Sequence, residues 1–198
     1  MKLRHLALPL LTSLALITAC SEAPSTGGPG ASASAADTTP IATAQALDVL
    51  AAQGKGFTAG ALMGANPVYV LFDPQCPHCS HLWEASVPLH SKVKFVWLPV
   101  SLLNAKSTPQ GAAIMTAANP VEAMTAHEKS LLAGQGGTAA SASIAPEVEA
   151  AIKANTALLD RLGATSVPYV VAKNRGTGEV VTSAGSLSTE ALAKLLGL

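Results

Sequence analysis

The feature that most constrains the fold of this chain is a short apolar run that leads directly into a pair of cysteines. Residues 68–72 read Val-Tyr-Val-Leu-Phe, which predicts a buried strand. After Asp73-Pro74-Gln75 comes Cys-Pro-His-Cys, and residues 76–87 predict a helix that bends or ends near Pro88. The sequence therefore places both cysteines where a strand feeds a helix.

The remaining pattern predicts a second strand, several helices and a final hairpin. Residues 92–98 alternate as a strand. Three helix starts follow, because a polar N-cap or a proline suits the first helical turn. These starts are Thr108-Pro109, Asn119-Pro120 and Pro146. The other expected elements are a helix over residues 43–53, a hairpin of residues 169–172 and 179–182, and a helix over residues 188–196.

The helix that Pro146 opens has an apolar line that includes one polar residue, and Gly163 is expected to stop it. The line consists of Val148, Ile152, Asn155, Leu159 and Leu162. Residues 134–143, which precede this helix, predict a loop of small residues.

The helix start gives Cys76 its chemistry. Free N–H groups and the positive end of the helix dipole stabilise a thiolate, which lowers the pKa of Cys76 and makes it nucleophilic near neutral pH. Cys79 follows one turn later, where it can resolve a mixed disulfide. We expect Cys76 to be acidic and exposed, and Cys79 to be buried and slow.

Two residues between the cysteines tune this pair. Pro77 suits the first helical position and does not compete for the N–H groups near the sulfur. A positive charge on His78 would stabilise reduced Cys76 further and make the disulfide form more oxidising. Dithiol exchange of this kind needs no metal and no organic cofactor.

Two other interpretations of the motif remain open. Cys76, His78, Cys79 and His81 are possible zinc ligands close together in sequence. On one helix, however, position 78 points well away from the face that positions 76 and 79 share. A purely structural disulfide is the other alternative, but a bridge between Cys76 and Cys79 closes a very short loop and constrains the unfolded chain little.

Composition narrows the class of protein. The chain has 12 basic and 12 acidic residues, and this balance argues against nucleic acid as the main partner. Alanine is abundant and only 4% of residues are aromatic, which favours a helix-rich domain over a sandwich of many strands. Besides Cys76 and Cys79, the only cysteine is Cys20, so residues 41–198 allow one internal disulfide.

The N-terminus predicts an export signal and a tether. A basic start, an apolar stretch and Ile17-Thr18-Ala19-Cys20 resemble the lipobox of bacterial lipoproteins. We expect a signal peptide over residues 1–19, a lipidated Cys20, a flexible tether to residue 40 and a catalytic domain over residues 41–198. Ser21 favours the outer membrane. The alternative is an ordinary signal peptide that is cut nearby.

The folded part resembles a known family. The Asp-Pro-x-Cys-Pro-x-Cys motif after a strand, together with residues 160–168, is similar to the catalytic domain of the DsbC/DsbG group of periplasmic disulfide isomerases. The resemblance implies an α/β, thioredoxin-like fold with a helical insertion between the second strand and the proline segment. It also implies that Val167-Pro168 is a cis peptide bond beside the cysteines, with the backbone of Val167 offered to an extended substrate.

Two departures from that family matter. Only about residues 41–66 precede the catalytic part, too few for the family's dimerisation domain, so we expect a monomer. The family usually has Thr before the cis proline and Tyr before the second cysteine, where this chain has Val167 and His78. The latter combination is found in the DsbA oxidases, so the scaffold resembles an isomerase and the site an oxidase.

The sequence thus predicts a periplasmic, lipid-anchored thiol:disulfide oxidoreductase. Its expected partners are exported proteins with cysteines and a membrane redox protein. The first alternative is an isomerase or reductase of the DsbG type. An alternative of another class is a lipoprotein that binds or delivers metal through the same cysteines.

Other residues are assigned lesser roles. Asp73 either tunes the proton balance of Cys76 or is a solvated turn residue, and the second interpretation is preferred. The remaining expectations are an exposed or half-exposed His81, a solvated helix face for His127 and Glu128, and packing in the core or at the site rim for Trp83 and Trp97.

Overall fold

A five-stranded mixed sheet forms the centre of the domain in the computed structural model, which describes residues 37–140 and 143–198. Its strand order is β1-β3-β2-β4-β5. The central pair β2 and β3 is parallel, and the other neighbouring pairs are antiparallel. The strands are β1 (Phe57–Gly60), β2 (Val68–Phe72), β3 (Lys94–Pro99), β4 (Tyr169–Lys173) and β5 (Val180–Ala184).

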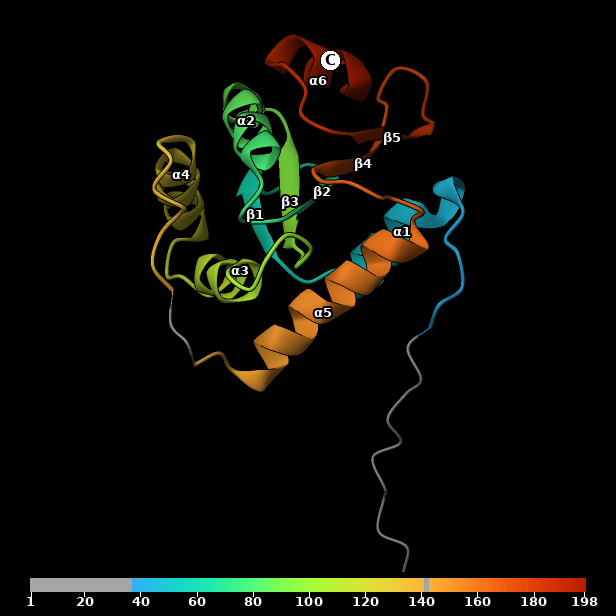
Figure 1. Ribbon diagram of the computed structural model, residues 1–198. Helices are drawn as coiled ribbons and strands as arrows, with labels where there is room; N and C mark the ends of the chain where they lie inside the picture. Colours follow the sequence, from blue (N-terminus) through green and yellow to red (C-terminus); the bar gives the residue numbers. More distant parts are fainter. Residues whose placement is uncertain (1–36, 141–142) are drawn as a thin grey trace, which may run out of the picture. The chain divides into compact units, whose positions relative to one another are not determined.

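Helices cover both faces of this sheet (Figure 1). Helices α2 and α6 lie on one face, where α4 also packs against α2, and α1 and α5 lie on the other. Between β3 and β4 the chain forms α3, α4 and α5, which confirms the predicted helical insertion. The helices are η1 (Thr43–Gln45), α1 (Ala46–Gln53), α2 (Pro77–Ser86), η2 (Val87–Leu89), α3 (Ser107–Met115), α4 (Pro120–Leu132), α5 (Pro146–Arg161) and α6 (Thr189–Leu196).

The register of the parallel pair positions the cysteine motif. Phe72, the last residue of β2, lies opposite Pro99, the last residue of β3. Because parallel strands end at the same edge of a sheet, the loops that follow them meet there. The loop from β2 to α2 therefore lies beside the start of the helical insertion.

Most of the predicted elements are confirmed, with boundaries that shift by one or two residues. Asn119 caps α4 by accepting a hydrogen bond from the backbone N–H of Glu122 (3.3 Å), and Ser188 caps α6 in the same way. The prediction of Thr108 as an N-cap is wrong. Helix α3 begins at Ser107 after Lys106, and the Thr108 hydroxyl donates to the Ser101 hydroxyl (2.9 Å).

One strand was not predicted from the sequence. Residues 57–60 form β1, which pairs antiparallel with β3 so that Phe57 lies opposite Trp97. The strand is short and glycines flank it, so it carries little periodic signal. Gly56 has to be glycine, because a Cβ there would lie 1.9 Å from the carbonyl oxygen of Trp97.

Four aromatic residues form one buried cluster between α2 and the sheet. Trp83 of α2 packs on Trp97 of β3 with ring centroids 5.1 Å apart, and Phe72 packs on Trp97 at 5.6 Å. Phe57 from β1 completes the cluster against Phe72 and Trp83. Trp83 and Trp97 are thus core residues, as one of the two sequence-based interpretations had them.

The N-terminal predictions fall largely outside the described residues. The signal peptide over residues 1–19, Cys20 and residues 21–36 of the tether are not described. Residues 37–40 are described, and there the Arg161 side chain pairs with Asp37 (2.8 Å) and donates to the carbonyl of Thr39 (2.9 Å). Among the helices of the described residues, none is long and apolar enough to cross a membrane.

Asn155 is the polar member of the apolar line on α5, and it is fully buried. Its side-chain oxygen accepts from the N–H of Lys55 (3.0 Å), and its amide donates to the carbonyls of Lys55 (2.7 Å) and Pro99 (2.9 Å). These three bonds join α5 to the loop before β1 and to the end of β3.

We predict that Asn155→Leu destabilises the domain although leucine would continue the apolar line. The substitution leaves buried backbone groups without partners, so we expect a loss of about 2–4 kcal/mol in the free energy of unfolding. Lys153→Leu introduces the same residue at an exposed position of α5 and should change stability by less than about 0.5 kcal/mol. Urea unfolding of both variants measures this difference, and equal stabilities would contradict the role given to Asn155.

Candidate active site

The two cysteines occupy the first turn of α2. Cys76 is the N-cap residue with an extended backbone (φ −99°, ψ 111°), and Pro77 is the first helical residue. The N–H of Cys79 donates to the carbonyl of Cys76 (2.9 Å), and both cysteines are free thiols. Cys79 is 0% exposed, as expected, but Cys76 is only 5% exposed. The prediction of an exposed Cys76 is therefore wrong, because neighbouring segments cover the helix start.

The pair is electrostatically asymmetric. A hydrogen bond from the Cys79 thiol lowers the pKa of Cys76 most, the backbone N–H groups of Cys79 and His78 and the His78 charge lower it further, and burial opposes them. The resulting pKa of Cys76 is about 6. Burial, first, and then the hydrogen bond to Cys76 raise the pKa of Cys79 well above its usual value. At neutral pH the site therefore holds a thiolate at Cys76 and a thiol at Cys79.

The segment before β4 lies against the reactive sulfur. The Val167-Pro168 peptide bond is cis, as the family resemblance implied. The carbonyl oxygen of Val167 lies 3.5 Å from Sγ of Cys76 and accepts a hydrogen bond when that sulfur is protonated. Pro77 and His78 are exposed beside this contact. All six predicted site residues outside the N-terminal segment thus come from one strand–helix junction and one proline segment.

Asp73 is not a solvated turn residue, because its side chain is fully buried. Its carboxylate accepts four hydrogen bonds. Oδ1 accepts from the N–H of Gln75 (2.8 Å) and the hydroxyl of Ser107 (2.7 Å). Oδ2 accepts from the N–H groups of Leu102 (2.7 Å) and Leu103 (2.9 Å). The loop before Cys76 is thereby tied to the segment after β3 and to the start of α3.

His127 and Glu128 are also buried, so the prediction of a solvated helix face for them is wrong. Helix α4 packs this face against α2 and the cysteine loop. Met124, His127, Glu128 and Leu131 recur at helical spacing, and this periodicity is the sequence signal that could have placed them inward. The polar side chains of His127 and Glu128 obscured this periodicity.

Glu128 lies behind the cysteine helix. One carboxylate oxygen accepts a hydrogen bond from the hydroxyl of Ser80, and the other has no hydrogen-bond partner. Burial is the main cause that raises the pKa of Glu128 to about 8, and the Ser80 hydrogen bond opposes it. The negative charges of Cys76, Asp73 and Glu84 raise it further. The carboxyl group is thus mostly protonated at neutral pH.

A polar network covers the cysteine loop from the insertion. The Gln75 amide donates to the carbonyl of Gly136 (3.0 Å) and also bonds the side-chain oxygen of Gln110. The Gln110 amide in turn donates to the carbonyls of Gly136 (3.0 Å) and Thr138 (2.9 Å). From the sequence these residues belong only to a loop and a helix, since nothing local marks partners that are far apart in the chain.

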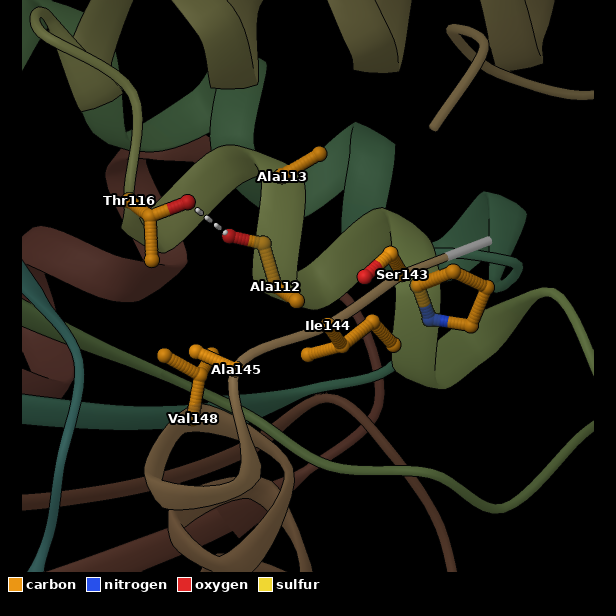
Figure 2. A pocket seen from close by; sticks show the side chains of 8 residues that line it. Ala112, Ala113, Thr116, Ser143, Ile144, Ala145 and Val148 are labelled. Atoms are coloured by element: carbon orange, nitrogen blue, oxygen red, sulfur yellow. Dashed lines mark hydrogen bonds between the residues drawn. The ribbon is translucent and has the colours of Figure 1, made fainter. Parts of the chain in front are cut away.

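A metal site and an apolar pocket are the other possible sites among the described residues. Among the described residues, no group of three or more His, Cys, Asp or Glu side chains is arranged to hold a metal ion. His81 is exposed, as expected, on a face of α2 away from the buried cysteines. A pocket of about 220 Å³ lies between α3 and the start of α5 (Figure 2). Small apolar residues such as Ala112, Ile144 and Val148 line it, and no cysteine or titratable side chain does.

The fold and this site define a thioredoxin-like domain with a dithiol at the start of a helix. No protein-family model matches the chain. It is similar to the thiol:disulfide interchange protein DsbG of Pseudomonas aeruginosa, 29% identical over 133 residues, which cover 66% of this chain and 50% of that protein. It is 30% identical over 105 residues to DsbG of Escherichia coli, covering 52% of this chain and 42% of that protein.

Solved structures agree with this fold. The catalytic domain of Proteus mirabilis ScsC matches with a TM-score of 0.60 and 15% identity, over 77% of this chain and 95% of that one. The thiol-disulfide exchange protein α-DsbA2 from Wolbachia pipientis matches with a TM-score of 0.59 and 14% identity, over 78% and 94% of the two chains. These comparisons confirm the thioredoxin-like fold and the resemblance to the Dsb proteins. The chain spans half or less of the length of the DsbG proteins it matches.

We predict that Glu128→Gln alters the pH dependence of stability. The pKa of Glu128 rises from 4.5 to about 8 on folding, so the stability it contributes is fully present below about pH 4.5 and is lost as pH rises through 8. Glutamine cannot ionise. Between pH 5 and pH 9, the free energy of unfolding of the variant should therefore rise relative to that of the wild type by at least about 1 kcal/mol.

Urea unfolding of both proteins across this pH range measures the difference, in which the contributions of groups that titrate independently of Glu128 cancel. Glu149→Gln removes an exposed acid on α5 and serves as the control. A constant difference between Glu128→Gln and the wild type would show that Glu128 ionises as it does in water.

Proposed function

We propose that the protein is a periplasmic thiol:disulfide oxidoreductase that acts on cysteines of exported proteins. The observation that carries the proposal is the asymmetry of the dithiol: Cys76 has a pKa of about 6, while the pKa of buried Cys79 is raised. A structural pair needs no such difference. The likeness to thiol:disulfide interchange proteins over 66% of the chain supports the same activity.

The reaction is two successive thiol–disulfide exchanges. In the oxidising direction, a substrate thiolate attacks the Cys76 sulfur of the Cys76–Cys79 disulfide, and the Cys79 thiolate leaves and takes up a proton. A second substrate thiolate then attacks the substrate sulfur of this mixed disulfide and releases the Cys76 thiolate. The substrate loses two electrons and two protons. The enzyme takes up both electrons and one proton, ending as the thiolate of Cys76 and the thiol of Cys79, and the second proton goes to solvent.

Val167 is proposed as the docking point for the substrate backbone. Its carbonyl oxygen lies 3.5 Å from the Cys76 sulfur, so a peptide that pairs with this segment brings its cysteine to the reactive atom. Main-chain pairing is independent of side-chain identity, which suits an enzyme that serves many exported proteins.

The proposed direction is oxidation. The hydrogen bonds and the His78 charge that lower the pKa of Cys76 stabilise the reduced form, and a more stable reduced form makes the disulfide a stronger oxidant. Val167 and His78 also match the DsbA pattern. The second candidate is isomerisation or reduction, which the likeness to two DsbG proteins favours. A metal-delivery role has no comparable support from the described residues.

The cellular setting is part of the proposal. Residues 1–19 would direct export, lipidation of Cys20 would anchor the chain, and residues 21–36 would let the domain reach partners away from the membrane. The proposed site is the periplasmic side of the outer membrane, with the protein acting as a monomer. A membrane redox protein would restore the oxidised or reduced state between turnovers.

We predict that Cys79→Ser traps mixed disulfides with exported proteins, whereas Cys76→Ser traps none. Only Cys76 forms the bond to substrate, and without Cys79 that bond is not resolved. Non-reducing gels of cells that express each variant give the answer. Equal trapping by both variants would contradict the assigned roles.

The reduction potential of the Cys76–Cys79 pair should be nearer that of DsbA, about −120 mV, than that of thioredoxin, about −270 mV. The reason is the low pKa of Cys76, which stabilises the reduced state. Equilibration with glutathione buffers measures the potential directly. A value near that of thioredoxin would identify a reductant and overturn the role given to His78.

A further inference from the structure

His127, which the proposed reaction does not use, reaches from α4 to the loop that carries Cys76. Its Nε2 lies 2.7 Å from the carbonyl oxygen of Pro74. Its Nδ1 accepts the backbone N–H of Thr138 (3.1 Å), which means that the ring proton sits on Nε2 and is donated to Pro74. Burial lowers the pKa of His127, although the Pro74 hydrogen bond opposes this, so the ring is neutral at neutral pH.

The Pro74-Gln75 peptide is consequently held on both sides. His127 binds its carbonyl oxygen, and the Asp73 carboxylate accepts its N–H (2.8 Å). The next N–H, that of Cys76, donates to the carbonyl of Asp73 (2.9 Å) and closes a tight turn. If this peptide rotated, its carbonyl oxygen would face the Asp73 carboxylate. The His127 hydrogen bond thus fixes the plane of the Pro74-Gln75 peptide, which directly precedes the peptide that joins Gln75 to Cys76.

The ring of His127 is itself held by Gly137 and by the backbone N–H of Thr138. Gly137 has φ +83°, and a Cβ on it would lie 2.3 Å from Cε1 of His127. The ring therefore rests directly on this glycine and cannot shift toward it. Gly134 in the same loop has a similar φ of +73° but open space where its Cβ would be. The two glycines have similar positive φ angles, and only at Gly137 would a Cβ meet the histidine.

We propose that His127 is a positioning residue through which the helical insertion sets the reactivity of Cys76. By holding the Pro74 carbonyl, it fixes the direction in which the chain enters α2 and keeps the Cys76 sulfur over the N–H groups of His78 and Cys79. The consequence for catalysis rests on the proposed function, but the effect on Cys76 is a property of the thiol and can be measured without any substrate.

The first test separates the two hydrogen bonds of His127. In His127→Gln, the side-chain amide can still donate to Pro74, whereas in His127→Asn the shorter side chain reaches only the Thr138 side. Alkylation of Cys76 by iodoacetamide in the full chain, followed against pH by mass spectrometry of the Cys76 peptide, gives the apparent pKa. We expect His127→Asn to raise it by about one unit and His127→Gln to stay near the wild type.

The second test leaves the histidine in place. Gly137→Ala should push the ring off Pro74 and reproduce the His127→Asn shift. Gly134→Ala also places a side chain at a positive φ but does not touch the ring, and it should leave the apparent pKa of Cys76 unchanged. Thermal unfolding of all four variants reports their stability separately.

The proposal is overturned if His127→Asn and Gly137→Ala lose stability while the alkylation profile of Cys76 stays that of the wild type. A shift of equal size in Gly134→Ala would also overturn it, because strain in the loop would then be the cause. Failure of the proposed function looks different. In that case the wild type exchanges no disulfide with a model dithiol, whatever the variants do to alkylation.

Discussion

The buried carboxylate of Asp73 is the interaction on which the rest of the site depends. It accepts hydrogen bonds from three backbone N–H groups and one hydroxyl, which come from the cysteine loop, the segment after β3 and the start of α3. A buried charge of this kind is tolerable only when such donors satisfy it. Because this side chain joins three segments at the ends of β2 and β3, it fixes the direction in which α2 starts. The position of Cys76 relative to the sheet is fixed with it.

The helical insertion adds further contacts to the cysteine loop that Asp73 holds. Asp73 holds the loop from the sheet side, and Gln75, Gln110 and His127 hold it from the side of α3 and α4. The same packing covers Cys76 more than a bare helix start would, yet the hydrogen bonds at that start outweigh burial in setting its pKa. At Cys79 burial is the largest influence and the hydrogen bond to Cys76 acts in the same direction, so its pKa is raised. The asymmetry of the pair thus follows from position along a single helical turn.

Local patterns predicted the parts of the molecule that depend on neighbours in sequence. The strand at residues 68–72, the helix start at Cys76 and the caps at Asn119 and Ser188 are of this kind. Asp73, His127 and Glu128 were misplaced because their partners lie far along the chain, and polar residue types usually indicate solvent. The cis bond at Pro168 came from the family resemblance alone, since X–Pro bonds are mostly trans.

Sequence likeness to DsbG and structural likeness to ScsC and α-DsbA2 leave the redox direction open for a physical reason. The thioredoxin-like fold fixes where the two sulfurs lie, and this is common to oxidases, isomerases and reductases. The direction depends on how strongly the reduced thiolate is stabilised, which a few groups around one sulfur decide. Here those groups are the N–H groups of His78 and Cys79, the Cys79 thiol and the His78 charge. The insertion holds the loop that presents Cys76 to these groups. The reduction potential of the Cys76–Cys79 pair therefore depends on how the insertion packs against the start of α2.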